Sequence, residues 1–338
     1  MNKTVLVSGG TGFIGSHTAV ELINAGYKVI IIDNLSNSEK NIVDGIERIT
    51  GTKVIFEQID TCDIKALRGV FDRYDFDSVI HFAAFKAVGE SVSEPLKYYR
   101  NNLISFMNIL ELMKEYTRHN IVFSSSATVY GDADVLPVTE QTPRKPATSP
   151  YGNTKQMCED ILRDCCAAYP VTHGIALRYF NPIGAHPTAI LGELPRGVPN
   201  NLVPFITQTA AGIRKELSIF GNDYDTPDGT CLRDYIDIVD LARAHVAALN
   251  RMTDGKMTEK YEIYNIGTGK PLSVKELVER FEAVNNVPVP HKYAPRREGD
   301  VPSVYADPTL ANKVLGWKAE RDIDDTLRAA WKWQQSLS

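Results

Sequence analysis

Two side chains on one expected helix have the types and the spacing for acid–base chemistry. Tyr151 and Lys155 lie four residues apart, after Ser149, a suitable N-cap, and Pro150, a suitable first helical residue. Residues at this spacing share one face of a helix, so the Lys155 ammonium can favour the phenolate of Tyr151. A free phenol has a pKa near 10, and lowering it to about 7 requires roughly 4 kcal/mol. Taken alone, the pair is equally compatible with a solvated contact.

Three consecutive serines, Ser124, Ser125 and Ser126, end a strand that the apolar run at residues 120–125 predicts. A hydroxyl in this place can bridge Tyr151 and a hydroxyl of a bound substrate. Proton transfer is therefore the chemistry that these groups favour.

A glycine-rich turn near the N-terminus has the pattern of a dinucleotide-binding loop. Gly9, Gly12 and Gly15 follow an expected strand at 4–8 and open an expected helix over 13–25. Glycines let the backbone approach a pyrophosphate, and the helix N-terminus offers N–H groups and a positive dipole end. A glycine-rich turn without a ligand is the alternative.

Asp33 ends the expected second strand, residues 28–32. In dinucleotide-binding folds an acidic residue here accepts hydrogen bonds from an adenosine ribose, and its charge disfavours a 2′-phosphate. Asp33 therefore favours NAD over NADP, although it can also be a helix-capping residue in the run 33–36. Together with the glycine turn and the serines, it favours the catalytic interpretation of Tyr151 and Lys155.

The elements that must position these groups alternate in the N-terminal half. Short apolar strands are expected at 4–8, 28–32, 53–57, 78–83 and 120–125, with amphipathic segments between them. This alternation predicts an α/β fold with a Rossmann-type doubly wound parallel sheet. Such sheets bind ligands beyond the carboxyl ends of their strands, where the polar groups above lie.

The second half of the chain has a different composition and less regular hydrophobic patterning. Prolines and glycines are frequent over 181–229, helical patterning returns at 238–252, 273–284 and 323–335, and 287–308 is rich in Pro and Arg. A chain of 338 residues can form one large and one smaller domain. We expect an NAD-binding domain over 1–180 and a smaller mixed substrate domain over 181–338, with the segment around 232–265 packing back on the first.

Composition narrows the class of protein further. The net charge of −5 comes without a dense basic run, so nucleic acid is not an expected partner. No apolar run approaches the roughly 20 residues of a membrane span, and the N-terminus leaves no room for a signal peptide. Five cysteines without a CxxC pair indicate reduced thiols and no metal site. We expect a cytoplasmic protein.

Nine runs spread over essentially the whole chain resemble the UDP-glucose 4-epimerase family of extended short-chain dehydrogenases/reductases. These runs are 9–15, 33–38, 81–83, 86–91, 124–131, 149–155, 178–182, 219–224 and 296–300. The resemblance implies that UDP-galactose and UDP-glucose are interconverted through a 4-keto intermediate, with transient hydride transfer to bound NAD. Tyr151 would be the proton acceptor, Lys155 its electrostatic partner and a ribose contact, and Ser126 the hydroxyl that positions the substrate.

Two other functions share this fold. A sugar-nucleotide 4,6-dehydratase needs an additional acid and base, whereas the run 126–130 contains no carboxylate. A catalytically silent NAD-binding protein is compatible with the fold, because fold does not determine function. The intact set of Ser126, Tyr151 and Lys155 argues against it.

The resemblance also implies two sets of binding residues. Those expected around NAD are Gly9, Gly12, Phe13, Ile14, Gly15, Asp33, Asn34, Asn37, Ser38, Asp60, Thr61, Phe82, Ala83, Lys86, Asn101, Ser124, Tyr151, Lys155 and Phe180. Those expected around the UDP-hexose are Lys86, Ser126, Tyr151, Tyr179, Asn181, Asn201, Leu202, Phe220, Arg233, Arg297, Asp300 and Val304. Phe82 and Phe180 are equally typical of an apolar core, and Arg297 of a solvated loop.

Three further expectations rest on the resemblance. Val304 stands where family members with a bulky Tyr are confined to unacetylated hexoses, so UDP-N-acetylglucosamine and UDP-N-acetylgalactosamine are expected substrates too, unless Tyr305 closes the space. A homodimer is expected through helices such as 95–116 and 157–168. Asp237 replaces a usual His and Thr61 a usual apolar residue, which leaves the tightness of NAD binding open.

Overall fold

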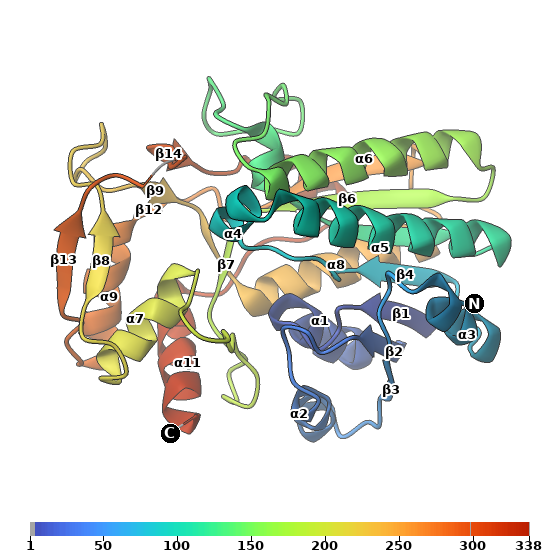
Figure 1. Cartoon of the computed structure of the whole chain (residues 1–338), viewed down its shortest axis with the longest axis horizontal. Coiled ribbons are helices and arrows are strands. Elements are labelled where there is room, and N and C mark those ends of the chain that lie inside the picture. Colours follow the sequence, from blue (N-terminus) through green and yellow to red (C-terminus); the bar gives the residue numbers. More distant parts are fainter. Residues whose placement is uncertain (1–3, 298, 338) are drawn as a thin grey trace.

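A seven-stranded parallel sheet forms the centre of the protein (Figure 1). The structure is a computed structural model, and it describes residues 4–297 and 299–337. The strand order is β11-β6-β5-β4-β1-β2-β3, and every hydrogen-bonded pair is parallel. The strands are β1 Thr4–Ser8, β2 Lys28–Asp33, β3 Ile55–Gln58, β4 Ser78–His81, β5 Asn120–Ser126, β6 His173–Tyr179 and β11 Tyr261–Ile266. This confirms the Rossmann-type doubly wound fold.

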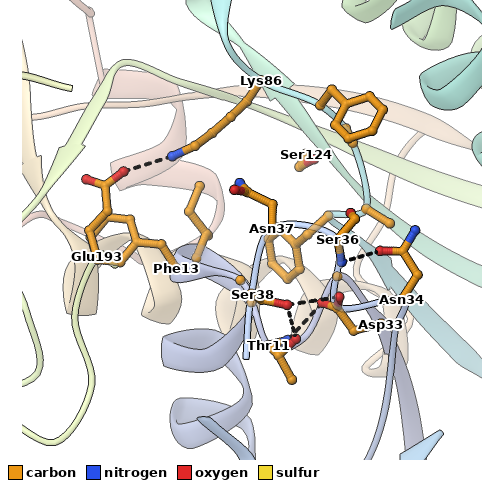
Figure 2. A pocket seen from close by; sticks show the side chains of 18 of the residues that line it. Thr11, Phe13, Asp33, Asn34, Ser36, Asn37, Ser38, Lys86, Ser124 and Glu193 are labelled. Carbon is orange, nitrogen blue, oxygen red and sulfur yellow. Dashed lines mark hydrogen bonds and ion pairs between the residues drawn. The ribbon is translucent and has the colours of Figure 1, made fainter. Parts of the chain in front are cut away.

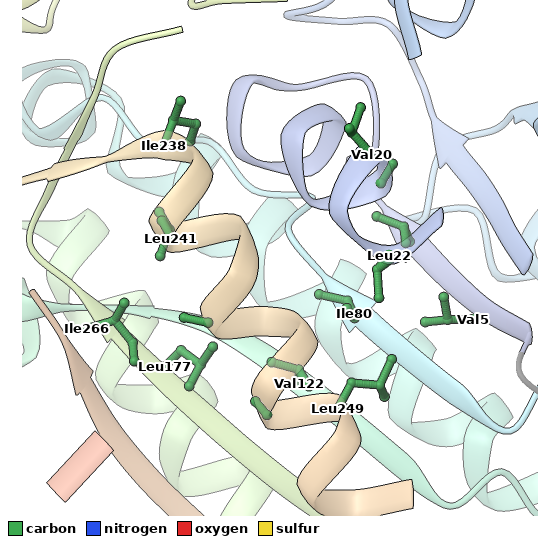
Figure 3. Close-up of a cluster of buried hydrophobic side chains, with 14 of the residues drawn as sticks. Val5, Val20, Leu22, Ile80, Val122, Leu177, Ile238, Leu241, Leu249 and Ile266 are labelled. Carbon is green, nitrogen blue, oxygen red and sulfur yellow. The ribbon is translucent and has the colours of Figure 1, made fainter. Parts of the chain in front are cut away.

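Helices cover both faces of the sheet because the strands are apolar on both sides. Val5, Val7 and Ile31 pack with α1 (Phe13–Asn24) and α8 (Ile238–Thr253) on one face, which Figure 3 shows in close-up. The alternate residues of the same strands point to the other face. There they pack with α3 (Ile64–Arg73), α5 (Pro95–Glu115) and α6 (Pro150–Ala168). Burial on both faces explains the near-continuous apolar runs of the sequence.

The strands differ from the sequence prediction mainly at their ends and at one edge. β3 begins at Ile55 rather than at residue 53, and β4 ends at His81 rather than at 83. Strands β6 and β11 were not among the strands predicted from the sequence. β11 follows α8, which contacts α1, and then joins the sheet edge beside β6. The segment from α8 to β11 therefore lies with the large sheet.

The remaining elements include several short sheets, and some of these elements enclose a third apolar cluster. The strands are β7 Asn181–Ile183, β8 Leu217–Phe220, β9 Leu232–Arg233, β10 Tyr235–Asp237, β12 Leu272–Ser273, β13 His291–Ala294 and β14 Ser303–Val304. The helices are α2 Asn41–Thr50, α4 Val88–Ser93, α7 Leu202–Ala210, α9 Val274–Asn285, α10 Thr309–Val314 and α11 Ile323–Ser336, with a 3₁₀ turn at Ala127–Tyr130. Within the described ranges, no helix is long and apolar enough to cross a lipid bilayer.

The two departures from the family pattern have structural partners. Asp237 is the N-cap of α8, where its side chain accepts from the Val239 N–H at 2.7 Å and from the Thr326 hydroxyl at 2.7 Å. The Thr61 hydroxyl lies 2.6 Å from that of Ser105 on α5. Both side chains are therefore accommodated by local hydrogen bonds.

Candidate active site

A cavity of about 260 Å³ lies at the carboxyl ends of β1, β2, β4 and β5. Figure 2 shows its polar wall, to which the loops after these strands contribute. The expected cofactor residues that line it are Gly9, Gly12, Phe13, Ile14, Gly15, Asp33, Asn34, Asn37, Ser38, Asp60, Thr61, Phe82, Ala83, Lys86, Asn101, Ser124, Tyr151 and Lys155. Tyr179 and Asn201, expected on the substrate side, line it too.

The glycine turn leaves room for a ligand against the backbone. Gly9 has a φ of 70°, and a Cβ on Gly15 would lie 2.3 Å from the Gly9 carbonyl oxygen, so a larger residue cannot be placed there. Gly12 is the N-cap of α1 and has no side chain to cover the helix N-terminus. This terminus forms part of the cavity wall, where its N–H groups suit an anion. The turn therefore fits the pyrophosphate of a dinucleotide.

Asp33 organises the loop after β2 at the edge of the cavity. One carboxylate oxygen accepts from the Leu35 N–H at 2.9 Å and the Ser38 hydroxyl at 3.1 Å, and the other accepts from the Thr11 N–H at 3.2 Å. Asp33 thus stabilises the loop after β2 and is not the helix cap that the alternative interpretation predicted, because the next helix begins at Asn41 with Lys40 as its N-cap. Asp33 also lines the cavity, as a contact between its carboxylate and the ribose of a bound dinucleotide requires.

Helix α6 brings Tyr151 and Lys155 to the cavity. Its N-cap is Ser149, whose side chain accepts from the Gly152 N–H at 3.1 Å, and Pro150 is its first residue. The Lys155 Nζ lies 5.8 Å from the centre of the Tyr151 ring and donates to the Ser124 carbonyl at 2.6 Å. The expected helix start and the shared face are thus both present.

The expected lowering of the Tyr151 pKa is not found in the polypeptide itself. Burial raises the pKa of Tyr151 to about 12, and a hydrogen bond with the Ser126 side chain acts weakly in the other direction. Burial also lowers the pKa of Lys155 to about 8. The spacing of the two residues predicts their mutual attraction, but it does not include the loss of hydration around a buried phenolate, which raises the pKa.

The three serines have three different environments. The Ser124 hydroxyl lies 3.2 Å from the Lys155 Nζ, and Ser124 lines the cavity. The Ser125 hydroxyl donates to Glu159 at 2.5 Å, and Glu159 forms a buried ion pair with Arg178 at 2.7 Å. Ser126 contacts Tyr151. Ser125 lines the cavity beside Ser124, whereas Ser126 is not part of the lining and reaches the site through its hydrogen bond with the Tyr151 side chain.

Tyr179 is held by a histidine that the sequence analysis did not identify. The Tyr179 hydroxyl is hydrogen-bonded to the Nε2 of His245 on α8, and the His245 Nδ1 lies 2.8 Å from the Leu241 carbonyl oxygen. Because that carbonyl can only accept, Nδ1 donates to it. Burial lowers the pKa of His245 to about 4, so the ring is neutral and its Nε2 accepts from Tyr179.

A second group of expected substrate residues lies outside the lining of the cavity. Arg297 donates to Asp300 at 2.8 Å and lies 5.8 Å from the centre of the Phe220 ring. Arg233 approaches the same carboxylate at 3.5 Å, and Val304 pairs with Arg233 between β14 and β9. Guanidinium groups beside an aromatic ring suit a diphosphate and a base.

Three expected residues occupy other places. Phe180 does not line the cavity but packs in a small apolar cluster with Val129, Tyr130 and Val138, which is its alternative, structural interpretation. Successive side chains of an extended segment point to opposite sides, so the Phe180 ring, directly after β6, lies on the side opposite to that of Tyr179. Asn181 belongs to β7 and pairs with β10, and Leu202 begins α7 directly after the cavity residue Asn201.

The cavity wall also contains residues that the sequence analysis missed, among them Thr11, Ser36, Glu193 and Arg196. Thr11 lies inside the glycine motif and Ser36 in the loop after Asp33, so their positions were a usable signal. Glu193 and Arg196 lie in an irregular, proline-rich segment that has no periodicity to read.

Comparisons with known proteins agree with this geometry. A family model described as GDP-mannose 4,6 dehydratase matches residues 6–330. A UDP-glucose 4-epimerase of Dictyostelium discoideum is 50% identical, over 99% of this chain and 96% of its own, and a human one is 47% identical, over 99% and 97%.

Solved structures agree as well. The UDP-glucose 4-epimerase of Bifidobacterium longum, crystallised with NAD+ and UDP, superposes with a TM-score of 0.95 at 47% identity and 98% coverage of both chains. Identity at this level over nearly the full length of both partners shows that the chain belongs to the UDP-glucose 4-epimerase family.

Proposed function

We propose that this protein is an NAD-dependent isomerase, a UDP-hexose 4-epimerase that interconverts UDP-galactose and UDP-glucose. The observation that carries the proposal is the placement of Tyr151 and Lys155 in the wall of the same cavity as the glycine turn and Asp33. The fold alone would support many activities, whereas this combination of groups at one site supports few.

NAD fits the cavity because the glycines let a ligand approach the backbone closely. Gly9, Gly12 and Gly15 would hold its pyrophosphate, and Asp33 its adenosine ribose. Bound there, NAD supplies a reversible two-electron oxidation at carbon 4 of the sugar. The protein contributes binding, orientation and control of the proton.

The proton of the sugar 4-hydroxyl moves to the Tyr151 phenolate oxygen and returns from it after the 4-keto sugar has turned over. The Lys155 ammonium favours the phenolate, and the Ser126 hydroxyl holds the substrate hydroxyl beside it. Because the proton returns from the same phenol, the cycle consumes no acid, and because the hydride taken from carbon 4 would also return to the sugar, it consumes no reductant.

The two alternative functions are not favoured. A 4,6-dehydratase needs an extra acid and base, and the 3₁₀ turn Ala127–Tyr130 that follows Ser126 carries neither. A silent NAD-binding protein would not need Tyr151 and Lys155 in the cavity wall.

We propose that the acetylated UDP-hexoses are substrates as well. Val304 is a half-buried, small side chain on β14 beside Arg233. Tyr305 is its neighbour, and the Tyr305 carbonyl accepts from the Val138 N–H at 3.0 Å. Val304→Tyr should lower kcat/KM for UDP-N-acetylgalactosamine by about tenfold or more relative to UDP-galactose, because a ring would occupy the space of the acetamido group. An unchanged ratio would exclude Val304 as the determinant.

We propose a homodimer in the cytoplasm. Helices α4, α5 and α6 contact one another and expose apolar side chains, including Val92 at 63%, Leu96 at 66% and Met107 at 43%. Exposed apolar side chains on helices that contact one another are typical of a subunit interface. All five cysteines, each in the described part of the chain, are free thiols, which suits a reducing compartment.

The function is tested by incubating the purified protein with UDP-galactose, without added NAD, and separating the UDP-hexoses. We expect UDP-glucose to appear and NAD to be released on denaturation. If neither sugar is converted at any NAD concentration, the proposed activity is wrong.

A further inference from the structure

Glu193 lies where the expected cofactor and substrate residues of the cavity meet. Its Oε1 accepts from the Lys86 Nζ at 2.9 Å, a contact that Figure 2 shows on one side of the cavity. The same oxygen accepts from the Asn201 amide at 2.6 Å. Lys86 follows β4, while Asn201 is the N-cap of α7. One carboxylate oxygen thus joins a residue from each half of the binding site.

The backbone of Glu193 is fixed on its far side. The Trp333 indole N–H on α11 donates to the Glu193 carbonyl at 3.0 Å. A Cβ on the preceding residue, Gly192, would lie 2.4 Å from the Trp333 ring, so the chain is pressed against the indole. The backbone at Glu193 is therefore restrained, which limits how far its carboxylate can move when Lys86 or Asn201 moves.

The same segment is attached to the cofactor loop at a second place. Arg196 donates to the Ser36 carbonyl at 2.8 Å and to the Ser38 carbonyl at 2.5 Å. Both carbonyls belong to the loop after β2 that Asp33 organises. The segment 192–201 thus spans from α11 across the cavity wall to the nucleotide loop.

The charge of Glu193 needs its partners. The Glu193 side chain is 11% exposed, whereas that of Lys86 is 46% exposed. A largely buried carboxylate is costly without a cation or hydrogen-bond donors, so Glu193 restrains Lys86 and Asn201 together. A ligand that draws either residue toward itself changes the hydrogen bonding available to the other.

We propose that Glu193 is a positioning residue that couples retention of the dinucleotide to binding of the UDP moiety. The coupling acts through the shared Oε1, which holds Lys86 and Asn201 at fixed positions. The proposal rests on the proposed function, because it needs a dinucleotide and a UDP-sugar in the same cavity. Coupling between two ligands is reciprocal, so each strengthens binding of the other by the same factor.

The test measures NAD binding with and without UDP, independently of turnover. The bound NAD is first removed from the parent, Glu193→Gln and Glu193→Ala by mild denaturation and refolding, and the dissociation constant of NAD is then measured by calorimetry in the presence and absence of saturating UDP. We expect UDP to tighten NAD binding of the parent by about 5-fold or more, within the usual range of coupling factors. This factor should fall to about 1 in Glu193→Ala and lie between in Glu193→Gln, which keeps an acceptor but loses the charge.

A matched control is Glu216→Gln, which removes a carboxylate paired with Lys292 at 2.5 Å outside the cavity. Its coupling factor should equal that of the parent. A merely structural effect would weaken NAD and UDP separately and leave the factor unchanged. The proposal is overturned if Glu193→Ala and Glu193→Gln both retain the parent factor, or if the parent shows no coupling. A failure of the proposed function differs from both, because the parent would then not bind NAD or not convert UDP-galactose.

Discussion

Burial moves the pKa values of Tyr151 and Lys155 in opposite directions, because the neutral form of each is favoured in a low-dielectric site. The pKa of Tyr151 is raised to about 12 and that of Lys155 is lowered to about 8. The phenolate therefore depends on neighbouring positive charge. Lys155, one turn further along α6, supplies such a charge.

Loss of the Tyr151 hydroxyl should affect chemistry and leave cofactor binding intact. Tyr151→Phe removes the proton acceptor but keeps the ring, so kcat should fall by on the order of 10²–10⁴. NAD retained after gel filtration should be unchanged, because the glycine turn and Asp33 remain. Turnover equal to that of the parent would remove Tyr151 from the mechanism.

The pH dependence should report Lys155. The pKa of Lys155 is about 8 and that of Tyr151 about 12, so the fraction of protein with both the ammonium and the phenolate rises by about tenfold per pH unit below pH 8 and is constant above it, up to about pH 12. We therefore expect kcat to rise up to about pH 8 and then to level off. Lys155→Arg keeps a positive charge throughout, so its lower activity should continue to rise above pH 8. Stopped assays from pH 6 to 10 would show this, and a parent profile that falls above pH 8 would contradict it.

At the scale of the element, the start of α6 determines the position of the phenol. Ser149 accepts from the Gly152 N–H, one residue beyond Tyr151. Ser149→Ala should lower the free energy of unfolding by about 1 kcal/mol. It should also lower kcat by about tenfold, because a frayed first turn misplaces the phenol.

The control for this change is another helix N-cap far from the cavity. Asp322 caps α11 by accepting from the Asp324 N–H at 2.8 Å. Asp322→Ala should lose similar stability in urea denaturation while kcat stays at the parent value. Equal loss of kcat in both variants would mean that stability, and not the position of Tyr151, governs turnover.

At the scale of the whole molecule, the exposed apolar face of α4, α5 and α6 should be covered by a second copy. Met107→Asp places a carboxylate in that face. Burying it unpaired costs about 3 kcal/mol, so the dimer dissociation constant should rise by about 100-fold. Ile213→Asp alters a more exposed apolar residue, 62% exposed, outside these helices. Sedimentation should show a monomer for the first variant and a dimer for the parent and the second.

The sequence by itself determined what depends on short spacing. The glycine turn, Asp33 and the Tyr151–Lys155 pair are each defined within one strand–turn–helix unit or one helical turn, so their geometry follows from local backbone rules. The parallel sheet followed from the alternation of apolar runs with helical segments. The division of the chain near residue 180 stays a prediction.

Only the tertiary structure decided what depends on contacts between distant segments. Glu193 meets Lys86 from 107 positions away, and Tyr179 meets His245 from 66 positions away. No periodicity links such pairs, because packing of whole elements brings them together. Burial too depends on the tertiary structure: Phe180 lies in an apolar cluster, and burial raises the pKa of Tyr151. The spacing of residues in the sequence does not predict how much hydration a side chain loses when these contacts form.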